Sequence, residues 1–332
     1  MRLGTTTFSF TNEWLAGSVS LAQMLGRVGR EGLGPGVELV GYQAWREFPR
    51  LTRDEVLTFR RLADRHDLEP TALGGYADLM RRVDRLMTTD EAIAFLSPQI
   101  EAARSLGFPI VRLHAGIPAD VLERLVPAAE AGGVRLATEI QGGQTPDSAA
   151  VSSILELRER LDTSAIALVL DTSVSMNAVP GAFRDAAVRA GATPDQVEEL
   201  AVLWASDAPM PELFGRLAAL DLTDVARVEL QSGFVRFGRQ DPHVWAPLVS
   251  SIAYVHAKFW EVDAAGSDPS VSTPELLAVL GEGGFDGVVA VEWGGSAWLD
   301  ADEVDAFDLV ARHGSFCKAV ISNGVPEVAT RT

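Results

Sequence analysis

Four side chains that can ligate a metal each stand at the C-terminal end of a separate apolar, strand-like run. The four runs are Val134–Glu139, Ala165–Asp171, Ile252–His256 and Val288–Glu292. A buried strand ends in a charged side chain only where a partner charge or a metal compensates for the lost hydration. Four such endings in one chain predict that Glu139, Asp171, His256 and Glu292 meet at a common point.

Three carboxylates and one imidazole form a mixed oxygen and nitrogen ligand set. This set suits Mn²⁺ best, with Mg²⁺, Co²⁺ and Fe²⁺ as alternatives, and it disfavours metals that prefer thiolates. A divalent cation also removes the repulsion that would raise the pKa values of three clustered carboxylates. Two of these residues have an alternative to the role of metal ligand. Asp171 could cap the helix that follows it, and His256 could be a buried core histidine whose hydrogen bonds are satisfied. Glutamate is a poor helix cap, so the first alternative does not extend to Glu139 and Glu292.

Short β-like runs alternate along the chain with longer amphipathic patterns, which indicates βαβ units and a parallel sheet. We expect strands near 2–9, 36–42, 70–75, 109–114, 133–140, 165–171, 251–258 and 287–293. We expect helices near 19–30, 53–67, 89–106, 117–131, 147–161, 274–281 and 302–320. This pattern predicts an α/β fold, the (β/α)₈ TIM barrel, in which all strands open on one face at their C-terminal ends.

A doubly wound open sheet is the alternative fold. Its usual mark is a glycine-rich turn after the first strand, and residues 9–14 here contain no glycine. We therefore assign residues 1–332 to a single barrel domain.

One interval in the alternation is too long for a single helix. More than eighty residues separate Asp171 from His256, with helical patterns over Pro194–Ala205 and Pro211–Leu220. We interpret residues 174–250 as a helical insertion between strands six and seven on the catalytic face, where βα loops tolerate growth. A scaffold for oligomerisation is an equal alternative. The sequence leaves open whether the insertion closes over substrate or docks a subunit.

Composition narrows the class of protein. The net charge is −18, with 46 acidic and 28 basic residues, which argues against a nucleic-acid binder. The N-terminus lacks an apolar signal core and no apolar run approaches the roughly 20 residues of a membrane span, so we expect a cytoplasmic protein without membrane contact. Cys317 is the single cysteine, so the chain cannot form an intramolecular disulfide. Its neighbours predict that its thiol is buried in the core on a helix.

The order Glu, Asp, His, Glu on strands five to eight resembles the xylose-isomerase-like TIM barrels, the sugar-phosphate isomerase/epimerase superfamily. The matching fragments are Thr138–Ile140, Leu170–Thr172, His256–Lys258 and Val291–Trp293. The resemblance implies that one divalent cation binds adjacent sugar oxygens, and that Glu139 and Glu292 double as ligands and as acid/base groups. The cation would polarise a carbonyl and stabilise the enediolate that forms when the neighbouring proton leaves.

The long interval between Asp171 and His256 departs from the isomerase/epimerase pattern, which usually keeps it short. The stretch His256–Asp263 resembles the α subunit of bacterial C-glycoside deglycosidases. This resemblance implies a 3-oxo-C-glycoside substrate, whose C–C bond to the aromatic aglycone breaks by β-elimination beside the ketone. It also implies a small β subunit as partner, and we expect an oligomer.

Three alternative functions stay open. The same ligands would serve a ketose or sugar-phosphate isomerase or epimerase. Metal-dependent DNA repair shares this barrel, but five histidines and the acidic surface count against it. The last alternative is a non-catalytic barrel subunit.

Several residues near the strand ends are candidates for roles beside the ligands. Gln141 stands where relatives often carry a histidine, and glutamine cannot take up a proton at neutral pH. His114, at the end of strand four, is then the candidate general base. Lys258 shares a strand face with His256, and we expect it to hold a substrate oxygen or to pair with a glutamate. It is one of only two lysines, the other being Lys318.

Aromatic and further ionisable residues complete the candidate set. Trp260 and Trp293 are candidates for stacking on a sugar or aglycone, and plain packing is the alternative for both. Glu38 either points into the barrel mouth or forms a buried ion pair. The remaining histidines, which we expect at the surface, are His66, His243 and His313.

Overall fold

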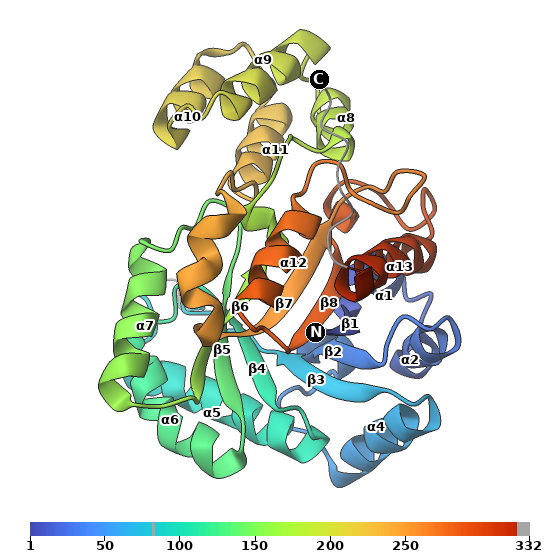
Figure 1. The fold of residues 1–332 in the computed structure, drawn as a ribbon, viewed down its shortest axis with the longest axis vertical. Helices are drawn as coiled ribbons and strands as arrows, with labels where there is room; N and C mark the ends of the chain where they lie inside the picture. Colours follow the sequence, from blue (N-terminus) through green and yellow to red (C-terminus); the bar gives the residue numbers. More distant parts are fainter. Residues whose placement is uncertain (82–83, 324–332) are drawn as a thin grey trace.

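Eight parallel strands close into a barrel in the computed structural model, which describes residues 1–81 and 84–323. The strands are β1 (Arg2–Thr6), β2 (Gly36–Val40), β3 (Glu69–Gly74), β4 (Ile110–His114), β5 (Arg135–Ile140), β6 (Ile166–Asp171), β7 (Ile252–Phe259) and β8 (Val288–Trp293). Each strand pairs with the next in the chain and β8 closes on β1. The predicted (β/α)₈ barrel is therefore confirmed (Figure 1).

Helices surround the barrel and shield the outer face of the sheet (Figure 1). They are α1 (Thr11–Leu15), α2 (Leu21–Arg30), α3 (Gly41–Ala44), α4 (Arg53–Arg65), α5 (Thr89–Leu106), α6 (Ala119–Gly132), α7 (Ala149–Leu161), α12 (Thr273–Glu282) and α13 (Ala306–Asn323). Capping boxes begin α2, α4 and α5, where Ser20, Thr52 and Thr88 each exchange hydrogen bonds with the third helical residue. Each such cap stabilises its helix by about 1 kcal/mol.

Four further helices lie between β6 and β7 and stand above one end of the barrel (Figure 1). They are α8 (Gly181–Arg189), α9 (Pro194–Ala205), α10 (Met210–Ala219) and α11 (Asp224–Phe234). The sequence patterns predict α9 and α10 but miss α8 and α11. These helices enclose their own apolar cluster, which includes Phe183, Trp204 and Phe234.

The period-two alternation of the strands sorts side chains between two sides of the sheet. Small and medium side chains fill the barrel interior, among them Ala72, Ala137, Ala167 and Ala290. Larger apolar side chains between sheet and helices form the main core. Alanines are five of the nine described members of the interior cluster, and Tyr254 is its largest member. No helix among the described residues is long and apolar enough to cross a membrane.

The last helix corrects one prediction about histidines. His313, which we expected at the surface, is fully buried on α13. Its ring stacks on Phe259 with centroids 4.3 Å apart, and its Nδ1 lies 2.9 Å from the Gly266 carbonyl oxygen. A neutral imidazole is moderately hydrophobic, so its ring can pack on the apolar face of α13. Cys317 is buried on the same helix as predicted, and burial raises the pKa of its thiol to about 12.

Burial at His313 predicts a pH-dependent stability. Burial lowers the pKa of His313 to about 4 from the ordinary 6.5. Between these values the unfolded chain takes up a proton that the folded chain does not. The free energy of unfolding should therefore fall by about 3 kcal/mol as the pH drops through this window, with no further loss from His313 below it. Urea unfolding of wild type and His313→Gln at several pH values measures this contribution.

His243 supplies the matched control, because it is exposed. His243→Gln should keep the wild-type pH profile, whereas His313→Gln should flatten it. Parallel profiles for wild type and His313→Gln would contradict the assignment.

Candidate metal centre and substrate cavity

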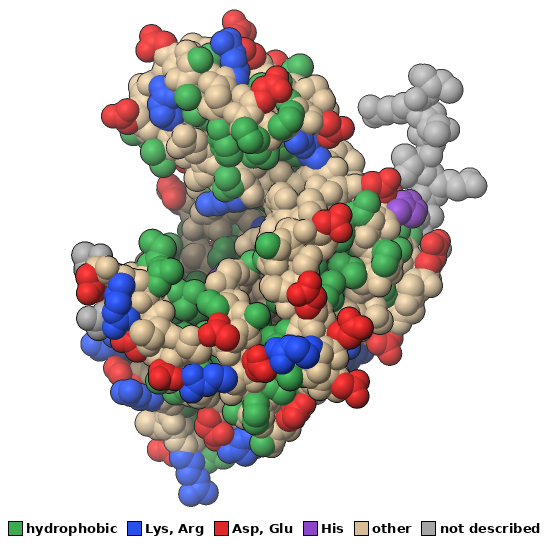
Figure 2. All heavy atoms as spheres, turned by 90° about the vertical axis from the view of Figure 1, so that its left-hand side faces the viewer, with side chains coloured by type: hydrophobic (Ala, Val, Ile, Leu, Met, Phe, Trp, Pro, Cys, Tyr) green, Lys and Arg blue, Asp and Glu red, His purple; other side chains and the backbone are tan. Residues whose placement is uncertain are grey.

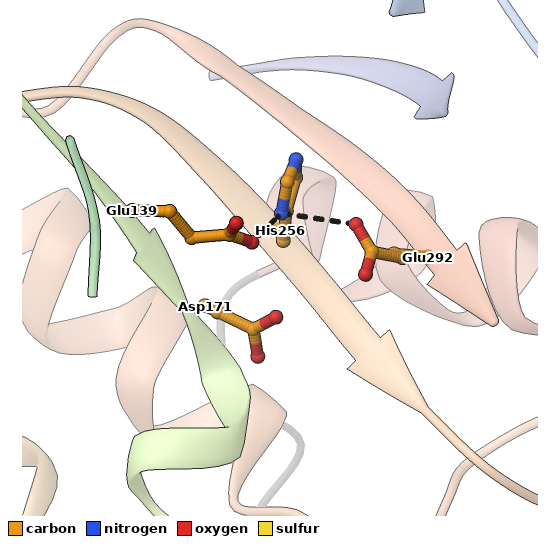
Figure 3. A group of neighbouring side chains, drawn as sticks. All are labelled: Glu139, Asp171, His256 and Glu292. Atoms are coloured by element: carbon orange, nitrogen blue, oxygen red, sulfur yellow. Dashed lines mark hydrogen bonds and ion pairs between the residues drawn. The ribbon is translucent and has the colours of Figure 1, made fainter. Parts of the chain in front are cut away.

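The four predicted ligands converge at the C-terminal ends of β5–β8. Glu139, Asp171, His256 and Glu292 each offer one ligand atom, and these atoms all lie within 4.8 Å of one another. All four side chains are buried and point toward a shared centre inside the barrel (Figure 3). Strand register explains the convergence, because Asp171 pairs with His256 and the inward positions of neighbouring strands lie at similar heights.

Two carboxylates approach the same nitrogen of His256. Its Nδ1 lies 2.7 Å from Glu139 Oε1 and 3.0 Å from Glu292 Oε2. The opposite ring nitrogen, Nε2, lies 2.7 Å from Glu38 Oε2. Burial lowers the pKa of His256, but Glu292, Glu38 and Glu139 together outweigh burial and hold it well above 6.5.

The carboxylates of this centre differ in their charge environment. Burial raises the pKa of Glu139, but Arg112 and His256 outweigh it and bring the pKa to about 2. Burial likewise opposes ionisation of Glu292, whose pKa His256 and Lys258 lower well below 4.5. Asp171 behaves in the opposite way, because burial raises its pKa more than Lys258 lowers it.

These residues fit a divalent cation. Asp171 Oδ1 accepts a hydrogen bond from the Ser173 backbone N–H at 2.7 Å, whereas its Oδ2 is buried without a hydrogen-bond partner. A buried carboxylate oxygen without such a partner is costly, whereas Glu139 and Glu292 also pair with Arg112 and Lys258. A cation among the four groups would satisfy Asp171 Oδ2 and would share the negative charge of Glu139 and Glu292. The donor set, three oxygens and one nitrogen, matches Mn²⁺, Mg²⁺ or Co²⁺ chemistry.

A second layer of charge lies beneath the ligands and links them to the opposite side of the barrel. Arg112 on β4 is buried, with its Nε 3.1 Å from Glu38 Oε1 and a terminal nitrogen 3.2 Å from Glu139 Oε2. The sequence left two positions open for Glu38, the barrel mouth or a buried ion pair. The structure shows both, since Glu38 faces the barrel interior and pairs with Arg112. Sequence reasoning missed Arg112, although its position two residues before His114 places it on the inward face of β4.

This layer predicts that Glu38 controls metal affinity through His256. A carboxylate on Nε2 orients the ring so that Nδ1 faces the ligand centre, and loss of such a partner costs about 10–100-fold in metal affinity. We expect Glu38→Gln to weaken Mn²⁺ binding by about tenfold, measured by titration of the metal-free protein. Glu69→Gln is the matched control, because Glu69 is an exposed glutamate at the start of β3, where it pairs with Arg2 of β1. Equal Mn²⁺ affinity in wild type and Glu38→Gln would contradict this role.

Lys258 supplies a positive charge next to the predicted ligands. Its Nζ pairs with Glu292 Oε1 and lies 3.6 Å from Asp171 Oδ2. It also lies 5.2 Å from the centroid of the Phe8 ring. Burial alone would lower the pKa of Lys258, but Glu292 and Asp171 raise it above 10.5, so the side chain stays charged.

A cavity of about 790 Å³ opens above the ligand centre. His114, Gln141 and Trp260 line it together with Glu139, Lys258 and Glu292. His114 is half-exposed, with Nδ1 3.5 Å from Glu139 Oε2. Burial and the charge of Arg112 lower its pKa.

The structure brings most of the predicted site residues to this cavity, but it places Trp293 elsewhere. Trp293 is fully buried in the main core and does not line the cavity. Its position next to Glu292 explains this, because successive strand residues face opposite sides of the sheet. Its indole N–H donates to the Trp260 carbonyl oxygen at 3.1 Å.

Comparison with known proteins agrees with this geometry. A family model described as the xylose isomerase-like TIM barrel matches residues 34–308. The chain belongs to this family. Within it, the chain is 31% identical over 323 residues to the 3'-dehydrocarminate deglycosidase alpha subunit of a Microbacterium species, covering 93% of this chain and 92% of the relative. It is also 30% identical to a C-glycoside deglycosidase alpha subunit of Arthrobacter globiformis, covering 98% and 94%.

Solved structures share the fold of this chain at much lower identity. A D-psicose 3-epimerase matches with a TM-score of 0.58 at 13% identity, covering 97% of this chain and 99% of the other. A sugar phosphate isomerase/epimerase from Parabacteroides distasonis matches with a TM-score of 0.57 at 14% identity, covering 98% and 95%. These likenesses show the barrel fold, whereas the sequence relatives are deglycosidase subunits by name.

Proposed function

We propose that this chain is the catalytic subunit of a Mn²⁺-dependent C-glycoside deglycosidase, a carbon–carbon lyase acting on 3-oxo-C-glycosides. The observation that carries the proposal is the similarity over nearly the whole chain, helices α8–α11 included, to relatives named deglycosidase alpha subunits. The buried ligand centre supports it, because enolisation beside a ketone needs a site that stabilises negative charge on oxygen.

The reaction is an elimination that needs no oxidant and no water. Loss of the proton on sugar C2, next to the C3 ketone, leaves an electron pair that forms the C1–C2 double bond. The C1–C(aryl) bond breaks with its electron pair on the aryl carbon, which then takes up a proton. The products are the aglycone with a new C–H bond and an unsaturated 3-oxo sugar.

Named residues would perform the proton transfers. His114 lies at the cavity wall next to Glu139 and would take the C2 proton, since Gln141 cannot. Glu139 and Glu292 are the alternative acid/base groups. Lys258, whose ammonium faces the cavity, would hold the oxygen on which charge develops. A divalent cation bound by Glu139, Asp171, His256 and Glu292 would supply Lewis acidity at that oxygen.

The relatives' names suggest a second subunit, and we propose that a small β subunit completes this enzyme. The test compares release of aglycone from a 3-oxo-C-glycoside by the Mn²⁺-loaded chain and by the chelator-treated chain, each with and without small proteins that co-purify from the host. Release that depends on Mn²⁺ supports the proposal. No release under any of these conditions, with conversion of a free ketose instead, would overturn it in favour of an isomerase or epimerase.

A further inference from the structure

The predicted ligands occupy only half of the barrel mouth. They come from β5–β8, and the closed strand order places β2 directly across the barrel from β6. Tyr42, just after β2, and Val235 with Arg236, from the segment that follows β6, line the same cavity. The cavity therefore has two facing outer walls, one from the barrel and one from the helices above it.

The space between these walls is larger than a sugar ring requires. Its volume of about 790 Å³ lies within the roughly 300–1,000 Å³ typical of pockets that enclose drug-sized ligands. Figure 2 shows the molecule hollowed between the upper helices and the barrel, with hydrophobic side chains on both sides of the hollow. A second group attached to the sugar would occupy the outer part.

The barrel wall is aromatic. Tyr42 is 44% exposed, yet its ring is held in place by edge-on neighbours. Its ring centroid lies 6.3 Å from that of Trp14 and 5.8 Å from that of Tyr76, with interplanar angles of 74° and 82°. Such edge-to-face contacts orient the ring and leave one side available to a planar ligand.

A glycine lets the opposite wall approach the barrel closely. Gly142 has a φ of +56°, and a Cβ there would lie 2.6 Å from the Val235 carbonyl oxygen and 3.2 Å from the Arg236 Cα. Because Gly142 follows Gln141 at the end of β5, residues 235–236 sit directly over the strand end that carries Glu139. The helical segment thus contributes to the substrate cavity itself.

Arg236 gives this wall a free positive charge. Its guanidinium lies 5.9 Å from the Trp298 ring centroid. Across residues 1–81 and 84–323, no carboxylate forms an ion pair with it. In a chain of net charge −18, an arginine without a carboxylate partner at the cavity rim suits an anionic ligand group.

We propose that Tyr42, Val235 and Arg236 form the subsite for the leaving group, and that it takes a planar aromatic ring bearing an acidic oxygen such as a phenolate. The subsite rests on the proposed function for its place in catalysis. Elimination leaves the electron pair of the broken bond on an aryl carbon, and an ionised ring oxygen facing Arg236 would hold the ring in register with the sugar. Tyr42 and Val235 supply the apolar faces.

The test is direct binding, which needs no turnover. Calorimetry on the Mn²⁺-loaded chain compares 2,4-dinitrophenolate with 2,4-dinitroanisole, which differ by the anionic oxygen. We expect Arg236→Gln to weaken binding of the phenolate by about tenfold and to leave the anisole unchanged. Tyr42→Ala should weaken both ligands, and Tyr42→Phe should weaken neither more than about twofold.

Matched controls come from the same helical segment. Arg216 on α10 and Val228 on α11 are surface residues outside the cavity, so Arg216→Gln and Val228→Ser should bind both ligands like wild type. Gly142→Ala should weaken the phenolate, whereas Gly215→Ala, at an α10 position outside the cavity with open space around it, should not. Unchanged phenolate binding in both Arg236→Gln and Tyr42→Ala would overturn the subsite. The proposed function would still stand in that case. Normal phenolate binding, with conversion of a free ketose in place of aglycone release, would overturn the proposed function alone.

Discussion

Glu139→Gln and His256→Ala are each expected to lose bound metal and catalytic activity together. Both residues place a ligand atom in the centre, and neither glutamine nor alanine replaces that atom with its charge or lone pair. Because Lewis acidity contributes several kcal/mol of charge stabilisation, activity should fall by about a thousandfold or more. Metal analysis and aglycone release on the same samples make the measurement.

The barrel should stay folded in these variants, since the ligands lie above the apolar layers. Circular dichroism and thermal unfolding check this expectation. Asp171→Asn is the fallback variant, because it keeps the size of the side chain and the oxygen that accepts from Ser173. Glu69→Gln and His243→Ala change exposed residues of the same types and should keep full activity. Full turnover in Glu139→Gln or His256→Ala would remove the catalytic assignment.

Lys258→Met is expected to separate catalysis from metal binding. The Lys258 ammonium pairs with Glu292 and lines the cavity, but it offers no ligand atom to a cation. Its removal should lower kcat by about a hundredfold, the usual effect of losing one group that stabilises developing charge on oxygen. Metal content should remain stoichiometric, because the four ligands are unchanged. Kinetics and metal analysis of one preparation give both values.

Lys318 makes an unusually clean control, since the chain contains only these two lysines. It lies exposed on α13, and Lys318→Met should behave like wild type in both measurements. A Lys258→Met variant with wild-type kcat would show that the lysine only balances the charge of Glu292 and Asp171.

The centre combines charges of both signs at close range. Arg112, His256 and Lys258 oppose Glu38, Glu139, Asp171 and Glu292, and all of them are buried or nearly so. Burial of charge is costly unless partners compensate it. Burial raises the pKa of Asp171, and its Oδ2, which accepts no hydrogen bond and lies 3.6 Å from Lys258 Nζ, is where a cation would complete the balance.

The sequence alone predicts the barrel and the convergence of four side chains at its mouth: Glu139, Asp171, His256 and Glu292. Each strand appears as an apolar run, and in a parallel barrel all such runs end on one face, so a terminal carboxylate or imidazole needs no further information to be placed there. The same alternation already separates Glu292 from Trp293. Trp293 is a stacking candidate by its aromatic character alone, and its burial on the outer side of the sheet decides for the packing alternative.

Tertiary structure decided the contacts between residues distant in the chain. Glu38 and His256 come from strands 218 residues apart, and only closure of the barrel brings Glu38, Arg112 and His256 together beneath the ligands. Burial of His313 likewise depends on how α13 packs against Phe259. The outer cavity depends on the Gly142 contact that seats Val235 and Arg236 over β5. The local sequence pattern predicts which face of the sheet a side chain lies on. Closure of the barrel decides which distant charged residues lie next to it.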